Sequence, residues 1–571
     1  MTTVTNPGPG EQWRLGGEPN ERSAPLAQGP SEPAADRSRL ALERSVMVVT
    51  VEHLAWSLVA LWAVVTRIAA LGARPLSASE ARNALFEFDL ANKTAHATAA
   101  GFHPVSAGWI HLIEAGLFVA IGAGDFTARI GFALSGVLMV AMAFAMRPYV
   151  GRTGAIALGA MFALSPSVTY FSRDVSAVTP ASAMALVTLA LFLALIREPG
   201  RRSAFRLGVV GGLMISAGPA GVVDSGAFIV ALATLGLWEL VATRKAFLRL
   251  RVWMDRYTYL AALTIVAALA LALLSEGVLP NIVSRLRTAA PGSVTAGIPG
   301  YMRGIAFYGP PLALYEFLIV IPAVVGALLI ISLRIRSHFA WWCLIWTAAT
   351  VAFYLWIPVR TPGTTEAMVV PAAFLGAFAI DHVHHTVAWR YVRYAVTAIA
   401  LLTVYVQVLT NFVYFAPDAS EAQWARHANL AWREGATTLQ TAELCRQVTK
   451  QFPTAQASVY FHESGARSGT PALRWYLRSL TPIDDADAAS VVVDIGGSQT
   501  ATADSGSEPF YEFDFQEAWQ PDLRGLDAAR ALRYMLTAQL WGSVAITPAV
   551  ITVRSTGASS PTIIMPPGAS R

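Results

Sequence analysis

A polar stretch with closely spaced acids follows the first apolar run of the chain. The segment RPLSASEARNALFEFDL, at residues 74–90, contains Glu80, Glu87 and Asp89. Apolar residues recur at helical spacing from Ser79 onward, which predicts an amphipathic helix lying at a membrane surface. A carboxylate in such a place can take or steer a proton from a hydroxyl or amide group. Glu80 is therefore our candidate for a catalytic acid or base or a metal ligand, with helix capping as the structural alternative.

Basic side chains near the ends of other apolar runs are candidates for binding a ligand. His103 stands in GFHPVSAGWIHL, Arg173 and Asp174 end LSPSVTYFSRD, and Arg360 follows LWIPV. Cations at a membrane surface can hold a negatively charged group through charge-assisted hydrogen bonds. The structural alternatives are interfacial anchoring for the two arginines and turn packing for His103.

Further charged residues fall at expected helix starts or inside apolar runs. Asp125 and Arg129 stand four residues apart, so we expect them to pair with each other. A charge inside an apolar run is costly enough to need a partner, and this applies to Glu114, Asp224 and Glu316. For Glu114 we expect packing within the helix bundle rather than transport.

Two groups of residues invite a functional interpretation and have a simpler structural one. The cluster DHVHH, at residues 381–385, contains metal-ligand types but stands beside arginines, which predicts a solvated cytoplasmic turn. Trp475, Tyr476, Trp519 and Trp541 have rings that suit a sugar face, but we expect core packing for them.

The composition is that of an integral membrane protein. Of the 571 residues, 54% are hydrophobic and 14% are charged, well below the roughly 25% charge of a soluble domain. The net charge of +5 is spread over short loops between apolar runs, which disfavours nucleic acid as a partner. The 2 cysteines do not form a disulfide framework or a metal-binding spacing.

The expected fold is mainly α, a polytopic transmembrane helix bundle of about 11–13 spans with a C-terminal extracytoplasmic α/β domain. We divide the chain into a disordered cytoplasmic tail at 1–48, a membrane domain at 49–415 with its first external loop at 73–104, and the α/β domain at 416–571. Basic loops place the N-terminus in the cytoplasm and the last domain outside. The predicted spans are 51–72, 105–123, 126–146, 154–172, 178–197, 207–222, 225–242, 257–275, 310–333, 338–357, 367–381 and 392–413.

One part of this topology conflicts with the positive-inside rule. Four apolar segments between Pro104 and Arg197 would leave Arg197 on the outside, against its charge. An odd number of crossings is needed, so one segment is half-inserted or two share a crossing.

The order and spacing of several motifs resemble the GT-C superfamily of membrane glycosyltransferases. The chain is similar to protein O-mannosyltransferases and the aminoarabinose transferase, and most similar to the flippase-activity-associated family of archaea and bacteria. The matching segments are SEARNA, FHPVSAGWIHL, GAGDFTARIGFALSG, LSPSVTYFSRD, VRTPGTTEAMVVPAAFLGAFAID and RWYLRSL. The resemblance implies a polyprenyl-phosphate-linked sugar donor and transfer on the external face, and it allows a divalent metal. Under it, Glu80 is the catalytic acid, and Arg173, Arg360, His103 and Asp174 contact the substrate.

The sequence departs from the family pattern at four places. The expected Asp-Glu pair reads Ser79-Glu80, the second arginine and the aspartate after Arg173 are replaced by Ser176 and Val178, and Gly363 stands for a tryptophan. A charged turn is replaced by SAGPAG, at residues 216–221. The chemistry has therefore been either rearranged or lost.

Two functions remain open from the sequence, with a third favoured less. The first is transfer of a sugar from a polyprenyl-phosphate donor to a lipid, glycan or protein acceptor by a multi-pass protein of the cell membrane. The second is a non-catalytic relative that binds a lipid-linked sugar or assists its translocation. An ion-coupled transporter is less favoured, because corresponding Gly/Pro-broken spans in two halves are missing. The expected partners are the lipid-linked donor and membrane lipids; the sequence establishes no cofactor, and a divalent metal stays open.

Overall fold

The computed structural model describes the main part of the membrane domain and much of the C-terminal domain. The described residues are 50–94, 109–198, 200–243, 315–333, 337–356, 363–386, 436–437, 439–452, 457–463, 470–495, 510–520 and 543–553, with a few more within 260–313 and 394–405 and at 529. The predicted tail, His103 and Arg360 lie outside these residues.

Six helices in the described part of the chain are long and apolar enough to cross a membrane. They are α2 (Val51–Ile68), α6 (Thr127–Ala145), α10 (Val178–Arg197), α12 (Pro219–Thr243), α18 (His338–Trp356) and α19 (Thr364–Thr386). A further pair, α8 (Arg152–Leu164) and α9 (Pro166–Ser172), is bent by 57° and makes a seventh if it is one span. The predicted polytopic helix bundle is confirmed.

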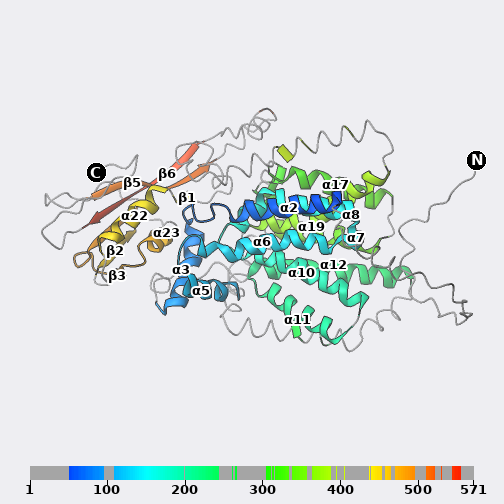
Figure 1. The fold of residues 1–571 in the computed structure, drawn as a ribbon, viewed down its shortest axis with the longest axis horizontal. Coiled ribbons are helices and arrows are strands. Elements are labelled where there is room, and N and C mark those ends of the chain that lie inside the picture. The colour runs from blue at the N-terminus through cyan, green and yellow to red at the C-terminus, as the bar shows by residue number, and fades with distance from the viewer. Residues whose placement is uncertain are drawn as a thin grey trace, which may run out of the picture.

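Shorter helices complete the bundle and its margin. They are α3 (Ala78–Asn92), α5 (Trp109–Ile121), α7 (Arg147–Val150), α11 (Arg201–Ile215) and α17 (Phe317–Ser332). Figure 1 shows α3 and α5 between the bundle and the C-terminal sheet. We call the end of the bundle beside α3 the domain end, and the opposite end, where α7 lies, the far end.

Helix α5 accounts for the topology conflict between Pro104 and Arg197. Its 13 residues measure roughly 20 Å, too short for about 30 Å of hydrocarbon. Its polar residues bind neighbouring elements, since His111 Nδ1 lies 2.7 Å from Glu87 Oε1 and Glu114 Oε1 accepts the Gly131 amide at 2.9 Å. The expected packing role of Glu114 is confirmed. If the bent α8–α9 pair is one span, it supplies an odd number of crossings together with α6 and α10.

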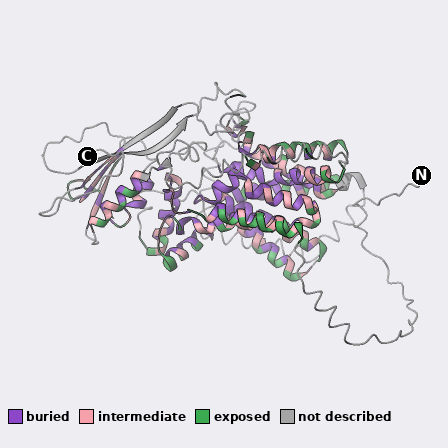
Figure 2. Ribbon diagram, turned by 45° about the horizontal axis from the view of Figure 1, so that its top comes forward, coloured by how far each residue is buried: buried purple, intermediate pink, exposed green. Residues whose placement is uncertain are grey.

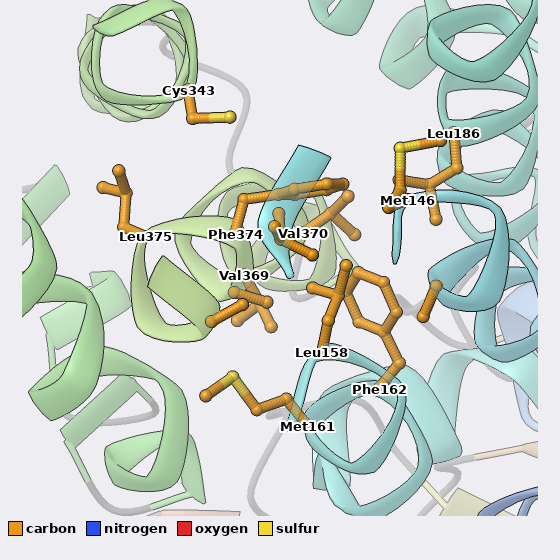
Figure 3. Packing of buried hydrophobic residues seen from close by; sticks show 14 of the residues in the cluster. Met146, Leu158, Met161, Phe162, Leu186, Cys343, Val369, Val370, Phe374 and Leu375 are labelled. Carbon is orange, nitrogen blue, oxygen red and sulfur yellow. The ribbon is translucent and has the colours of Figure 1, made fainter. Parts of the chain in front are cut away.

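The middle of the bundle is a packed apolar core. Figure 3 shows Phe162 from α8 facing Val370 and Phe374 from α19, and both phenylalanines are fully buried. Figure 2 shows exposed residues along the outside of the helices, and on α2 these include Leu54, Leu58 and Leu61. An apolar outer stripe on a bundle with an apolar core is the pattern of a helix that faces lipid.

The C-terminal domain is built on one six-stranded sheet with the order β1-β5-β6-β4-β2-β3. The strands are β1 (Ala436–Thr437), β2 (Ser458–Glu463), β3 (Thr481–Pro482), β4 (Val491–Ile495), β5 (Phe510–Gln520) and β6 (Ser543–Val553). β2 pairs in parallel with β3 and β4, and the remaining pairs are antiparallel. With α22 (Leu439–Gln451) and α23 (Thr470–Tyr476), the predicted α/β architecture is confirmed.

Candidate functional site

Helix α3 begins at Ala78, so Ser79, the serine next to Glu80, is its second residue. The N-cap is Ser77, whose side chain accepts the Glu80 amide while the Ser77 amide donates to Glu80 Oε2 at 2.8 Å. This reciprocal pair is a capping box with Glu80 at the third helical position. The capping role of Glu80 is therefore real, with a different serine as its partner.

Two guanidinium groups, those of Arg129 and Arg74, bind the Glu80 carboxylate. Arg129 donates from Nε to Oε1 at 2.7 Å and from Nη2 to Oε2 at 2.9 Å, and Arg74 donates to Oε1 at 3.1 Å. Burial raises the pKa of the Glu80 carboxyl, but the charges of Arg129 and Arg74 outweigh it and lower the pKa to about 2. A carboxylate held in this way has a low affinity for a proton.

Arg129 also holds the chain segment before α3. Its Nη atoms donate to the carbonyls of Leu71 at 3.1 Å, Arg74 at 2.6 Å and Pro75 at 3.1 Å. The expected pairing of Arg129 with Asp125 is therefore wrong, because each of the two binds a partner from elsewhere in the chain. Together Arg129 and Glu80 fix residues 69–77, which we call the arginine loop.

Asp125 fastens the C-terminal domain to the membrane domain. Its carboxylate accepts hydrogen bonds from Trp475 Nε1 at 2.8 Å, Tyr476 Oη at 3.0 Å and Arg446 Nη2 at 3.2 Å. The Tyr476 hydroxyl in turn accepts the Leu76 amide of the arginine loop at 2.8 Å. The RWYLRSL motif is thus a docking element, and the expected packing of Trp475 and Tyr476 is confirmed by their burial.

Arg173 follows α9 and caps the end of α2. It donates to the carbonyls of Thr66 at 2.9 Å, Ala69 at 2.8 Å and Ala70 at 3.2 Å. Burial lowers the pKa of the Arg173 guanidinium, and the positive charges of other arginines lower it further. These charges belong to Arg74, Arg129 and Arg67, in that order. The surroundings of Arg173 therefore carry more positive than negative charge.

The structure thus brings three of the five predicted site residues to the domain end. Glu80, Arg173 and Asp174 are all buried there, and Asp174 acts electrostatically on Arg74. Arg67, Arg74 and Arg129 join them, and we call these three with Arg173 the arginine cluster. The sequence carries a signal for Arg67, which lies inside the expected span 51–72, where a charge needs a partner.

The donors around Glu80 do not fit a divalent cation. Metal sites of this kind need several carboxylate or imidazole ligands, whereas Glu80 is surrounded by guanidinium groups. Among the residues the structure describes, no group of three or more His, Cys, Asp or Glu side chains can hold a metal ion.

The helix bundle with its C-terminal sheet shares its fold with solved structures. The aminoarabinose transferase ArnT from Cupriavidus metallidurans, in its crystal structure bound to undecaprenyl phosphate, aligns with a TM-score of 0.57 at 15% identity, over 89% of this chain and 99% of that one. Its apo structure aligns with a TM-score of 0.52 at 14% identity, over 91% and 98%.

A third alignment is weaker. The oligosaccharyltransferase from Archaeoglobus fulgidus, tethered to an acceptor peptide, gives a TM-score of 0.44 at 13% identity over 77% of this chain and 64% of that one. No protein-family model matches the sequence, and no curated protein matches it by sequence. At these identities the likeness concerns the fold.

Proposed function

We propose that the protein is a membrane glycosyltransferase that moves a sugar from a polyprenyl-phosphate donor to a lipid, glycan or protein acceptor on the extracytoplasmic face. The observation that carries this proposal is the arginine cluster at the domain end. The division of the chain at 49–415 and 416–571, and the cytoplasmic N-terminus, belong to the same proposal.

The arginine cluster is suited to a phosphate group. Guanidinium groups match phosphate oxygens in geometry and charge and form strong charge-assisted hydrogen bonds. Glu80 offsets part of the charge of Arg129 and Arg74, but Arg173 still experiences net repulsion from its neighbours. A bound phosphate would relieve that repulsion, which gives an anion a favourable place beside Arg173.

The fold supports a lipid-linked phosphate over a free one. In the ArnT structure with the same fold, the bound molecule is undecaprenyl phosphate. In this chain the arginine cluster stands at the end of a helix bundle whose outer face is apolar, with Leu54, Leu58 and Leu61 exposed on α2. A polyprenyl chain can therefore lie along the bundle in the lipid while its phosphate reaches the arginines.

The transfer needs stabilisation of the leaving group and positioning of the reactants. As the bond between the anomeric carbon and the phosphate oxygen breaks, negative charge grows on the phosphate, and preplaced guanidinium groups stabilise it. Glu80 contributes by holding Arg129 and Arg74 in place. The contacts of Glu80 favour this positioning role over proton transfer, and its role as the acid or base stays a prediction. Arg360 and His103 stay predicted substrate contacts.

The second candidate function is binding of a lipid-linked sugar without transfer. It is favoured by one observation, the engagement of both Glu80 oxygens by Arg129, Arg74 and the Ser77 amide. If no other carboxylate reaches the acceptor, the arginine cluster would hold the donor and the reaction would not proceed.

Purified protein in lipid nanodiscs separates the two functions. Binding of radiolabelled undecaprenyl phosphate and release or transfer of sugar from its mannosyl, glucosyl and arabinosyl derivatives would be measured for wild type, Arg173→Gln and Arg147→Gln. Arg147 lies at the far end, paired with Glu52 at 3.0 Å, and serves as the matched control. We expect at least about a tenfold loss of binding in Arg173→Gln alone. Wild-type turnover would establish the transferase, binding without turnover the second function, and no binding would refute both.

A further inference from the structure

Glu366 is a buried carboxylate at the domain end that none of the roles above uses. It is the third residue of α19, so it lies in the first helical turn, and its side chain is fully buried. Thr179 at the start of α10 donates to Glu366 Oε2 at 2.7 Å. Its other oxygen, Oε1, has no hydrogen-bond partner among the residues the structure describes.

This unused oxygen distinguishes Glu366 from two other buried carboxylates, Glu80 and Glu316. Glu80 has both oxygens bound to guanidinium groups. Glu316 is equally buried, and its oxygens accept the Ser165 hydroxyl at 2.8 and 2.9 Å and the Ser167 amide at 2.7 Å. Of these three, Glu366 alone keeps an acceptor free for a further donor from outside the described residues.

Two other buried acids also keep one oxygen without a partner in the described part of the chain, Glu87 and Glu114. The charges that act on them are those of His111 and, for Glu114, of Glu87. No member of the arginine cluster is among those charges. They therefore belong to the packing of α5, away from the proposed phosphate site.

Glu366, in contrast, borders the arginine cluster. The charge of Arg67 acts on Glu366 and also on Arg173. Just before Glu366, a methyl group built on Gly363 would lie 3.0 Å from Val178 and 3.7 Å from the ring of Phe171. The start of α19 therefore packs against the segments on either side of Arg173.

The neighbours of Glu366 are hydroxyl-bearing side chains. Thr365 has a buried hydroxyl without a partner among the described residues. The Ser182 hydroxyl lies beside the Glu366 carboxylate without reaching hydrogen-bond geometry. A buried acceptor without a donor is costly, so such a site is built to receive one. Carboxylate, hydroxyl and guanidinium groups together are suited to hydroxyl groups of a sugar.

We infer that Glu366 Oε1 accepts a hydrogen bond from a sugar hydroxyl of the lipid-linked ligand whose phosphate lies at the arginine cluster. The inference rests on the proposed function for the phosphate, and it adds the subsite that recognises the sugar. It assigns discrimination between bare and sugar-bearing lipid to a residue on α19, separate from Glu80 and Arg173.

The test compares two ligands and two matched variants in nanodiscs. The ligands are radiolabelled undecaprenyl phosphate, bare and carrying mannose, glucose or arabinose. The variants are Glu366→Gln and Glu316→Gln, which each replace the carboxyl group of a fully buried side chain by an amide of the same size. We expect Glu366→Gln to weaken binding of the preferred sugar-bearing lipid by about tenfold or more and to leave the bare lipid unchanged. Glu316→Gln should not discriminate between the two ligands.

Each other outcome overturns the inference in a distinguishable way. If Glu366→Gln weakens both lipids equally, or neither, the unused oxygen holds only a buried water and the sugar is recognised elsewhere, while binding through Arg173 stands. If Glu316→Gln shows the same selective loss, the effect follows from replacing any buried carboxyl group in the bundle. If wild-type protein binds neither lipid, the proposed function fails as well. Unchanged binding of the bare lipid also serves as the check that the Glu366→Gln protein is folded.

Discussion

The two ends of the helix bundle treat charge differently. At the far end, Glu52 and Arg147 pair at 3.0 Å with side chains 23% and 32% exposed. At the domain end, Glu80 and Arg129 pair at 2.7 Å with side chains 0% and 1% exposed. An exposed pair contributes little to stability, whereas charges taken fully out of water are costly unless every group is paired. The desolvation cost of buried charges therefore falls at the domain end, where the paired groups hold the arginine cluster in place.

The two ends should differ most in the free energy of unfolding that is lost when one carboxylate is removed from each. We expect Glu80→Gln to lower the free energy of unfolding by about 3–5 kcal/mol, because Arg129 and Arg74 stay buried without their partner. Glu52→Gln should change it by less than about 1 kcal/mol. Thermal unfolding in nanodiscs measures both, and equal losses would show that burial is not what separates the two ends.

Low pH should remove the stability that the Glu80 carboxylate contributes at the domain end. Because the pKa of Glu80 is lowered from 4.5 to about 2 in the folded protein, its stabilisation is present above pH 4.5 and is lost as the pH falls toward 2. The stability gap between wild type and Glu80→Gln should therefore be constant from pH 7 to pH 5 and then shrink. Unfolding midpoints of both proteins over this range provide the measurement, and a gap independent of pH would contradict the assignment.

A smaller effect is expected where the C-terminal domain meets the domain end. Tyr476→Phe removes the donor to Asp125 and the acceptor of the Leu76 amide, both buried, which should cost about 1–3 kcal/mol. Hydrogen exchange of the arginine loop should speed up in this variant. Tyr460→Phe, on β2 of the same domain, is the control, and matching exchange rates in the two variants would rule out a specific tie through Tyr476.

The smallest effect belongs to the far end. Arg147→Gln removes the partly exposed pair with Glu52 and should shift stability by under about 1 kcal/mol. Lipid binding and the unfolding midpoint of this variant should match those of wild type. If Arg147→Gln weakened ligand binding, part of the binding site would lie at the far end, and the functional difference between the far end and the domain end would be refuted.

Hydropathy predicted the long helices because length and apolar content are local properties. The expected spans 126–146, 178–197 and 338–357 lie within two residues of α6, α10 and α18. It failed for 105–123, where α5 is short, its His111 binds Glu87 on α3, and its Glu114 accepts the Gly131 amide on α6. The hydropathy and residue spacing of a segment are properties of that segment alone. They do not indicate which other element of the chain packs against it.

The same limit explains the candidate site. The spacing of Asp125 and Arg129 suggested a local pair worth about 0.2–0.5 kcal/mol. Arg129 instead gains two carboxylate and three carbonyl contacts, and Asp125 gains donors about 350 residues away. Such partners carry no signal in a single sequence. Glu366 could have been selected from the sequence. It is an acid in the first turn of an apolar helix, and a charge in such a position is expected to have a functional role or a partner.

The bond from Trp475 to Asp125 also has a consequence for how the protein is made. The two residues are 350 positions apart, which at about 5–20 residues per second is roughly 20–70 seconds of synthesis. During most of that interval the Asp125 carboxylate has none of its three donors from the C-terminal domain, Trp475, Tyr476 and Arg446. A chain cut short before the RWYLRSL motif would therefore lack the Trp475 and Tyr476 donors to Asp125 and the acceptor of the Leu76 amide, while the contacts among the arginines, Glu80 and the α2 carbonyls would all be present.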